Sequence, residues 1–302
     1  MTEATNRKRL IWIALVAVGV LVLLAAGIVA WNVGSVRLEA AKKLDQAATL
    51  VESADRYVIA IDAVVRAEVT ADVGRRAREL EPTVLTAKNQ LADAARLVTQ
   101  ARPMLNDEDR RRAGLLKTTA EAKIAMMEQA PLILSANSKA AAAQPLAEEA
   151  WALAIASDAL ADSAVASYNK LTKAGVQVSV VNNGKAEQGF KDARDLFSRA
   201  ATAFPEAGMD RYVAYVDQKL AQVAISRKSD AAWLAGQIAQ ANALIAPYNK
   251  ADAKGVAMVK ALPQTPAVAI ADAYKTTADA ATDAYFEARR RASTTDQLLK
   301  GF

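Results

Sequence analysis

The chain contains no cysteine and no histidine among its 302 residues. The lack of cysteine excludes disulfide bonds and thiol nucleophiles, and the lack of both excludes Cys or His metal sites. A Ser-His-Asp triad is excluded for the same reason. We therefore predict no catalytic residues, no cofactor and no bound metal, and we expect the stability of the fold to come from packing.

Glycine and aromatic residues are also scarce, with 12 glycines and an aromatic fraction of 5%. Alanine, leucine, valine and paired charges fill most of the chain, and strong helix formers dominate nearly every stretch. The composition predicts an all-α protein. The bias toward alanine, valine, aspartate and arginine is typical of a high-GC bacterium.

No large excess of either charge is present, since 38 Lys and Arg residues face 33 Asp and Glu residues. The net charge of +5 is spread along the chain rather than gathered in one segment. A charge of this size favours solubility and gives little support to a polyanionic partner, so we expect no nucleic-acid partner.

One long apolar run, residues 10–31, stands out from this background. A helix of about 22 residues rises roughly 33 Å, which is enough to cross the hydrocarbon core of a bilayer. Leu10 begins the run, and Trp12 and Trp31 lie near its two ends, where aromatic belts form. We predict a transmembrane anchor inserted in the lipid bilayer; a cleaved secretory signal is the alternative.

The charges beside this run predict its orientation. Arg7, Lys8 and Arg9 precede it directly, whereas the first basic residue after it is Arg37. The positive-inside rule then places residues 1–9 in the cytoplasm as a short tail. Residues 35–302 become an extracytoplasmic α-helical domain, an elongated helical bundle or helical repeat held at the cell membrane of a bacterial envelope.

The segment after the anchor has a helical seam, with apolar residues at alternating steps of three and four, as in a coiled coil. The positions are Leu44, Ala47, Val51, Ala54, Val58, Ile61 and Val65. Because Pro82 is the first proline, one helix could run from the membrane to about Leu80. The later prolines predict ends or kinks of helices of about 15 to 40 residues. Helix starts are expected at Asn106 and at Ser135 to Asn137.

One stretch departs from helical periodicity. Residues 175–181 alternate apolar and polar side chains and are followed by Asn182, Asn183 and Gly184. This pattern is typical of a strand and a turn. Because no second strand follows nearby, we predict an extended loop here, and we interpret Gly175 and Gly255 as C-caps of helices.

Short sequences recur at regular distances. The Asp-Arg-Tyr-Val sequence of residues 55–58 returns at 210–213, and Tyr-Asn-Lys of residues 168–170 returns at 248–250. These shifts of about 155 and 80 residues agree with a repeat of about 80 residues. Biased composition in an alanine-rich chain is the alternative explanation. The predicted repeats are 38–115, 116–193, 194–272 and a shorter 273–302.

A second, shorter pattern resembles the second helix of a tetratricopeptide repeat. Phe190, Ala193, Phe197, Ala200 and Pro205 have its spacing. The preceding segment does not match the first helix of that repeat, and no 34-residue period is present elsewhere. The resemblance implies a chaperone-like or adaptor module at the membrane.

Six aromatic residues are candidate interaction or repeat positions. They are Tyr57, Trp151, Tyr168, Tyr212, Trp233 and Tyr248. Packing inside the bundle is the alternative role for each of them.

Taken together, these features predict a scaffold, tether or accessory subunit of a cell-envelope complex that binds protein partners in or at the membrane. Self-association is one form of this function. The alternatives are the tetratricopeptide-like adaptor and an enzyme that acts on envelope glycans through paired carboxylates. We favour a protein that is not an enzyme, because the carboxylates pair with Lys or Arg at helical spacing, as surface charges do.

Overall fold

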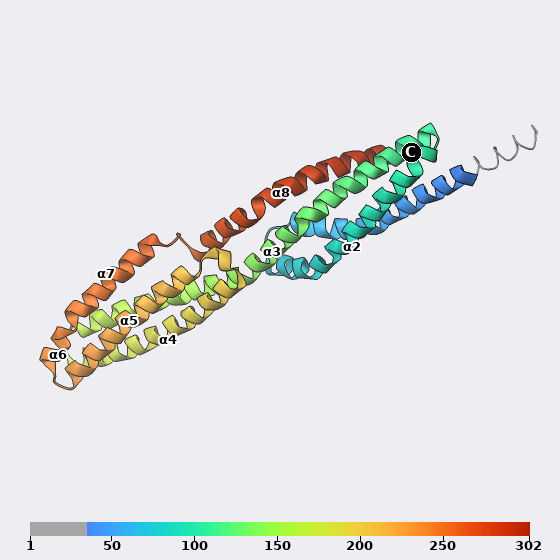
Figure 1. Ribbon diagram of the computed structural model, residues 1–302. Helices are drawn as coiled ribbons and strands as arrows, with labels where there is room; N and C mark the ends of the chain where they lie inside the picture. The colour runs from blue at the N-terminus through green and yellow to red at the C-terminus, as the bar shows by residue number, and fades with distance from the viewer. Residues whose placement is uncertain (1–34) are drawn as a thin grey trace, which may run out of the picture. The chain divides into compact units, whose positions relative to one another are not determined.

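The computed structural model describes residues 35–302, and the regular elements within this range are all helices (Figure 1). The predicted all-α fold is therefore confirmed for this part of the chain. The elements are a helix over residues 35–65, α2 (Ala71–Ala101), η1 (Arg102–Met104), α3 (Asp107–Tyr168), α4 (Lys173–Ala203), η2 (Pro205–Ala207), α5 (Asp210–Leu234), α6 (Ile238–Ala243), α7 (Ile245–Ala261) and α8 (Pro266–Leu299).

The predicted tail and anchor, residues 1–9 and 10–31, lie outside the described residues. The same is true of Arg7, Lys8, Arg9, Leu10, Trp12 and Trp31. Among the helices of residues 35–302, none combines the length and the apolar character that a membrane crossing requires.

The seam predicted for the first helix is confirmed, because all seven of its residues are buried. The expected continuation of this helix to Leu80 is wrong. The helix ends at residue 65, and α2 begins at Ala71. No proline or glycine marks this break, but the Thr70 hydroxyl accepts a hydrogen bond from the Val73 amide at 3.2 Å and so caps α2.

Three prolines lie inside helices rather than at their ends. Pro82 lies within α2, and Pro131 and Pro145 lie within α3, which reaches 62 residues and exceeds the expected length. All three prolines are exposed, so their rings lie on the outer faces of these helices and displace no core side chain.

The two predicted helix starts have different outcomes. The Asn106 side chain caps α3, because its Oδ1 accepts a hydrogen bond from the Asp109 amide at 2.8 Å. The predicted start at Ser135 to Asn137 is wrong, because these residues lie within α3. Asn137 is buried, and its Nδ2 lies 3.5 Å from the Val64 carbonyl oxygen.

The extended loop predicted at 175–184 is wrong as well, because this segment forms the first turns of α4. Thr172 is the N-cap, and its side chain accepts a hydrogen bond from the Gly175 amide. The buried positions follow the helical period, but two of them, Ser179 and Asn183, are polar. Val178 and Val181 point outward and are about half exposed, at 48% and 55%. The valines therefore produced a strand-like alternation that does not describe the buried face.

The C-cap interpretation of the two glycines is also wrong. Gly175 lies in the first turn of α4, and Gly255 is buried in the middle of α7. The positive φ angles at helix connections belong instead to Leu171, Gly208 and Gly236.

The described chain divides into two compact units. Unit 1 consists of residues 35–60, 83–129 and 284–302. In unit 1, α2 repeats the three-four seam of the first helix with buried apolar residues throughout. These residues are Val84, Ala87, Leu91, Ala94, Val98 and Ala101.

Unit 1 also contains a buried lysine. The side chain of Lys123 in α3 is 5% exposed, and its Nζ lies 2.8 Å from Asp55 and 3.0 Å from Asp296. Burial raises the pKa of the Asp55 carboxyl, whereas its contact with Lys123 acts in the opposite direction. This cluster ties the first helix, α3 and α8 together.

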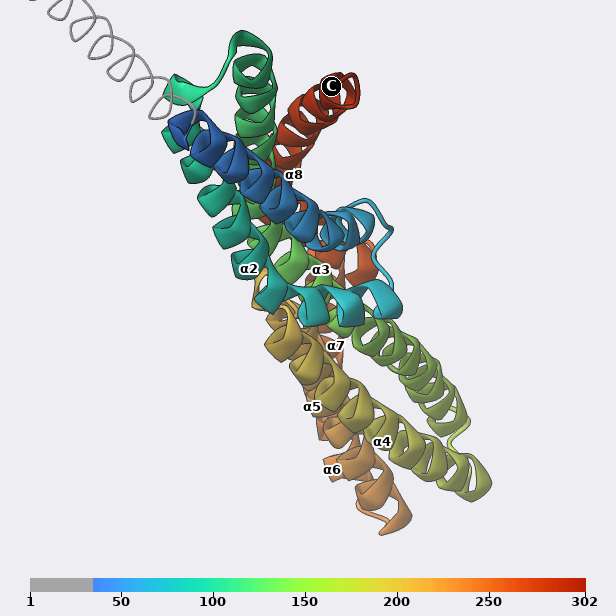
Figure 2. The same cartoon turned by 90° about the vertical axis from the view of Figure 1, so that its right-hand side faces the viewer.

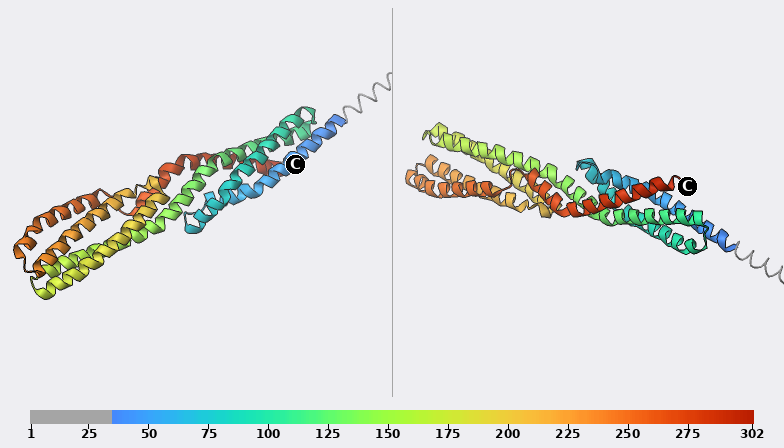
Figure 3. Two further views of the ribbon diagram at one scale, coloured as in Figure 1. Left: turned by 60° about the horizontal axis from the view of Figure 1, so that its bottom comes forward. Right: turned by 90° about the horizontal axis from the view of Figure 1, so that it is seen from above.

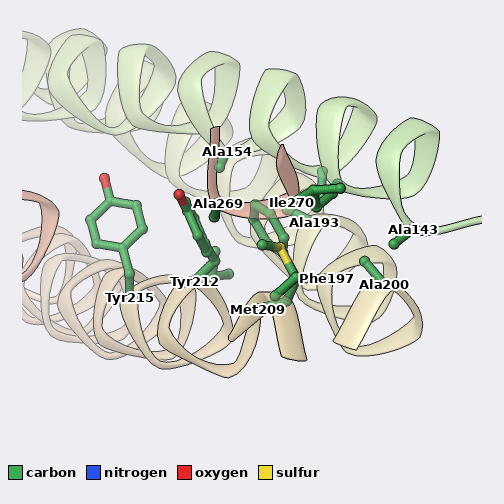
Figure 4. Close-up of a cluster of buried hydrophobic side chains, with 14 of the residues drawn as sticks. Ala143, Ala154, Ala193, Phe197, Ala200, Met209, Tyr212, Tyr215, Ala269 and Ile270 are labelled. Carbon is green, nitrogen blue, oxygen red and sulfur yellow. The ribbon is translucent and has the colours of Figure 1, made fainter. Parts of the chain in front are cut away.

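Unit 2 consists of residues 61–82 and 130–283. Its core lies between α3, α4, α5 and the start of α8 (Figure 4). It is more aromatic than the core of unit 1, in whose described residues Tyr285 is the buried aromatic side chain. Phe197 stacks on Tyr212 with ring centroids 5.2 Å apart, and Trp151 meets the same tyrosine edge-on at 5.7 Å. Helices α4 and α5 pack side by side (Figures 2 and 3).

Candidate functional site

A small pocket lies at the end of unit 2 where α3 ends, α5 passes and α7 begins. Its volume is about 180 Å³. Its lining contains both copies of the Tyr-Asn pair, 168–169 and 248–249, which the sequence separates by 80 positions. The complete lining is Val165, Tyr168, Asn169, Ile225, Ser226, Ser229, Leu244, Ile245, Tyr248 and Asn249. We call this space the tyrosine pocket.

One wall of the tyrosine pocket is fixed by the hydroxyl group of Ser229. Its Oγ lies 3.0 Å from the Tyr168 hydroxyl and 3.3 Å from the Ala241 carbonyl oxygen. The serine can donate to the carbonyl while it accepts from the tyrosine. These contacts join the end of α3, α5 and α6 in one arrangement.

A second part of the lining is held through Tyr248. Burial raises the pKa of its hydroxyl, and a hydrogen bond with Gln222 acts in the opposite direction. The Gln222 Nε2 in turn donates to Asp252 at 2.9 Å. Tyr248 is therefore a neutral phenol whose position depends on α5.

A buried polar cluster lies beside the pocket, between α4 and α5. Asp230 is 0% exposed, and its carboxylate accepts hydrogen bonds from the Ser179 hydroxyl at 2.9 Å and from the Asn183 amide at 2.8 Å. The same Asn183 nitrogen donates to Ser226, which lines the pocket, at 2.9 Å. We call Ser179, Asn183, Ser226 and Asp230 the α4–α5 polar cluster.

Burial raises the pKa of the Asp230 carboxyl above its ordinary value of 3.8. Hydrogen bonds from Asn183 and Ser179 and the charge of Arg227 act in the opposite direction but do not cancel the effect of burial. A buried carboxylate with hydrogen-bond donors restricts how α4 and α5 can pair, because any shift along the helices would leave it unsatisfied.

Lys219 forms a second polar contact farther along α5. Its side chain is 9% exposed, and its Nζ lies 2.5 Å from Asp158 on α3. The Lys219 side chain also passes close to Gly255 of α7, where the Cβ of an alanine would lie 3.7 Å from it, an ordinary van der Waals contact. Asp162, one turn after Asp158, has a pKa raised first by burial and then by the neighbouring carboxylate. This contact connects α3, α5 and α7.

The chemistry of the tyrosine pocket is neutral. Its lining offers aliphatic and aromatic carbon, the hydroxyl groups of two serines and two tyrosines, and the amides of Asn169 and Asn249. Such a surface suits an uncharged apolar group. The polar part of the ligand next to that group can exchange hydrogen bonds with the two amides. Among residues 35–302, no group of three or more Asp or Glu side chains is arranged to hold a metal ion.

The six aromatic candidates have four different environments. Tyr168 and Tyr248 meet in the pocket, and Trp151 and Tyr212 meet in the core of unit 2. Trp233 is half-buried near the end of α5. Tyr57 is half-buried in unit 1, where the Arg56 guanidinium lies 4.7 Å from its ring centroid.

The tetratricopeptide-like spacing marks a packing face. Phe190, Ala193, Phe197 and Ala200 are all 0% exposed, and Pro205 begins η2. The helix that carries them has 31 residues, whereas a tetratricopeptide unit fits two helices into about 34 residues. The resemblance therefore ends at this packing face.

Sequence reasoning missed most of the pocket lining and the whole α4–α5 polar cluster. A signal was present. The buried residues of α4 continue at steps of three and four through the polar positions, as Val176, Ser179, Asn183, Ala186, Phe190, Ala193, Phe197 and Ala200. The inward face of α5 shows the same spacing through its own polar positions. Its residues are Met209, Tyr212, Val216, Lys219, Val223, Ser226 and Asp230, all of them buried except Ser226, which is half-buried. A search for spacing that ignored polarity would have found both faces.

The fold and the site define a class: an all-α protein with a buried polar cluster beside a small neutral pocket. Comparison with known proteins does not narrow this class, because no family model, no curated protein and no solved structure matches the chain.

Proposed function

We propose that the chain is a single-pass membrane protein whose helical body binds another protein outside the cytoplasm, as a scaffold, tether or accessory subunit of an envelope complex. The anchor is residues 10–31, and Arg7, Lys8 and Arg9 keep the N-terminus in the cytoplasm. The body then carries its binding surface on the other side of the membrane.

The tyrosine pocket is the observation that carries the binding part of this proposal. Its volume of about 180 Å³ lies below the range of about 300 to 1,000 Å³ of sites for drug-sized molecules. A dry cavity of about 150 Å³ holds a benzene ring, so one large apolar side chain fits. Ile245 at its edge is 48% exposed and adds apolar surface around the opening. The occupant that we propose is an apolar side chain of the partner protein.

The residues around the opening indicate the chemistry of the partner on either side of that apolar residue. The amides of Asn169 and Asn249 are exposed and can exchange hydrogen bonds with the peptide groups of the partner. Exposed Lys170 and Lys250 follow these asparagines directly. We therefore propose that an acidic residue adjoins the apolar side chain of the partner.

The neutral lining also supports binding rather than catalysis. General acid–base chemistry needs a titratable group beside the reacting bond, with a pKa matched to the working pH. The tyrosine hydroxyl groups are the titratable groups of this lining, and burial raises the pKa of Tyr248 further from neutrality.

Photo-crosslinking in the cells that produce the protein tests this function. A benzophenone amino acid replaces Ile245 at the pocket edge, and the matched control carries it at Ile155, an isoleucine of α3 that is 55% exposed and outside the lining. We expect one discrete adduct from the position of Ile245 and none from that of Ile155.

A pocket-filling variant makes the test specific. Val165→Phe in the crosslinking background places a phenyl ring in the volume meant for the partner, and the adduct should fall at least tenfold while the circular dichroism of the purified chain stays unchanged. An adduct that survives Val165→Phe, or that forms equally at both isoleucines, contradicts binding at the tyrosine pocket.

A further inference from the structure

The end of unit 1 where the first helix begins also contains the turn between α2 and α3. Two ion pairs fix this placement: Arg112 lies 3.8 Å from Asp45, and Lys123 lies 2.8 Å from Asp55. The sequence offset is 67 in the first pair and 68 in the second, so α3 and the first helix run parallel. Figures 1 and 3 show the turn at the same end as the first described residues of that helix.

The same sequence offset gives the position of the turn along the axis of the first helix. Asp107, the first residue of α3, lies level with about residue 40 of the first helix, because 107 minus 67 is 40. The connection before it, residues 102–106, is therefore level with the first turns of that helix, about 8 Å or less from residue 35 along the axis.

Only a few residues of the sequence separate the predicted anchor from the first helix. The anchor ends at Trp31, and Asn32, Val33 and Gly34 separate it from Ser35. Four residue steps span at most about 14 Å. An anchor in this position keeps the turn of unit 1 within reach of the membrane surface.

The side chains at this end combine exposed apolar and basic groups. Met104 in the turn is 47% exposed, and Leu38 in the first helix is 59% exposed. Arg102 and Arg111 are exposed and line an open groove of about 600 Å³. Apolar side chains flanked by arginines are typical of surfaces that lie in the interfacial layer of a bilayer.

Two aspartates in the first turn of α3 are engaged within unit 1. Asp107 pairs with Arg110 at 3.1 Å, and Asp109 accepts a hydrogen bond from the Asn106 side chain at 2.8 Å. In the part of the chain that the structure describes, Arg102 and Arg111 form no such ion pair, so their guanidinium groups can bind phosphate.

We propose that this end of unit 1 rests on the membrane that the anchor crosses, with Met104 and Leu38 at the acyl boundary and Arg102 and Arg111 bound to lipid phosphates. The inference rests on the anchor of the proposed function and adds a second, peripheral contact with the same bilayer. A body docked in this way is held at a fixed distance from the membrane.

The test uses the full chain in liposomes, and the absence of native cysteine makes single labels free of background. A fluorophore is attached at Met104→Cys in the turn, at Leu21→Cys in the anchor and at Ala159→Cys on the exposed surface of α3 in unit 2. Lipids with a nitroxide at the headgroup or along the acyl chain supply the quencher.

In vesicles of phosphatidylglycerol and phosphatidylcholine, headgroup nitroxides should quench the label at position 104 at least threefold more than the label at position 159. The chain nitroxides should quench position 21. Quenching at 21 without quenching at 104 overturns the docked turn and leaves the anchor intact. No quenching at 21 overturns the anchor itself, and the docked turn with it.

The arginines are tested in the same vesicles. Each basic residue near an anionic surface contributes about fivefold to binding. Arg102→Gln together with Arg111→Gln should therefore lower quenching at position 104 at least twofold, and so should vesicles of phosphatidylcholine alone. Arg75→Gln, which changes an exposed arginine paired with Asp72 and Glu79, is the control and should change nothing. If quenching at position 104 changes neither in the double Arg→Gln variant nor in vesicles of phosphatidylcholine alone, the phosphate contacts are contradicted.

Discussion

The first helix and α4 bury faces with the same spacing of residues, but the buried side chains differ in polarity. Both place a buried residue at every third or fourth position over their length. In the first helix every residue of this seam is apolar, whereas the seam of α4 contains Ser179 and Asn183 in its N-terminal half and Phe190 and Phe197 in its C-terminal half. An apolar seam can tolerate more than one pairing, but a seam that supplies hydrogen-bond donors to a buried carboxylate is matched to one register.

The polar half of α4 also contacts the lining of the tyrosine pocket. Asn183 reaches Ser226 of the lining, so the α4–α5 polar cluster positions one wall of the pocket. The aromatic half of the same helix packs in the core instead (Figure 4). One helix therefore supplies stability at one end and a fixed site at the other.

The largest effect should come from the apolar seam. Leu44→Ala removes a side chain that is 2% exposed and should lower the free energy of unfolding by about 2 to 5 kcal/mol. Ile59→Ala in the same helix changes a residue that is 68% exposed and should cost less than about 0.5 kcal/mol. Denaturant unfolding of the detergent-solubilised chain, followed by circular dichroism, measures both. Equal losses would place the seam on another face.

The polar cluster should give the next largest effect. Asp230→Ala leaves the Ser179 hydroxyl without its carboxylate acceptor and removes one acceptor of the Asn183 amide, at a cost of about 1 to 3 kcal/mol. Asp230→Asn keeps an acceptor of the same shape and should cost less. The emission of Trp151 and Trp233 reports the unfolding of unit 2. If Asp230→Ala left the free energy of unfolding unchanged, the cluster would contribute nothing to the stability of the α4–α5 pair.

The pH dependence of the same variants tests the buried charge. Burial raises the pKa of Asp230 in the folded chain, so the folded state binds this proton more tightly than the unfolded state. The contribution of Asp230 to stability is therefore most favourable below pH 3.8 and declines as the pH rises through the raised value. Relative to the wild type, Asp230→Asn should become more stable between about pH 4 and pH 7, as measured by denaturant midpoints. If the difference in stability between Asp230→Asn and the wild type did not change with pH, it would contradict the raised pKa of Asp230.

The smallest effect tests whether residues 175–184 are helical. An added Cβ meets no atom within 4 Å at Gly184 in α4 or at Gly236 before α6, so the two sites differ in backbone conformation rather than in space. Gly184→Ala should stabilise the chain by up to about 1 kcal/mol, because alanine is the better helix former. Gly236→Ala should destabilise it, because φ is 76° there. Thermal melts distinguish the signs, and destabilisation by Gly184→Ala would favour the turn that Asn182 to Gly184 suggested.

The sequence predicted those parts of the fold in which burial follows hydrophobicity. The seam from Leu44 to Val65 and the cap at Asn106 belong to this class. The first turns of α4 do not, because an alternation of valines outweighed a buried face made of Ser179 and Asn183. The passage of α3 through Pro131 was also missed, since the exposure of a proline depends on tertiary packing.

The candidate site could be predicted only in fragments. Tyr168 and Tyr248 were selected as separate aromatic residues, and their recurrence suggested a repeat of about 80 residues, which stays a prediction. The sequence motif lies at the end of α3 in one copy and in the first turn of α7 in the other, so its local context could not show that both line one pocket. The two copies line one pocket because of the path that the chain takes through α5 and α6 between them.

The most direct test of the account is the side of the membrane on which the body lies. Single cysteines at Thr2 and at exposed Lys228 of α5 are treated in intact cells with a membrane-impermeant maleimide. For an extracytoplasmic body we expect labelling of Lys228→Cys in intact cells and of Thr2→Cys only after the cells are permeabilised. Labelling of Thr2→Cys with protection of Lys228→Cys would place the body in the cytoplasm and contradict an extracytoplasmic scaffold.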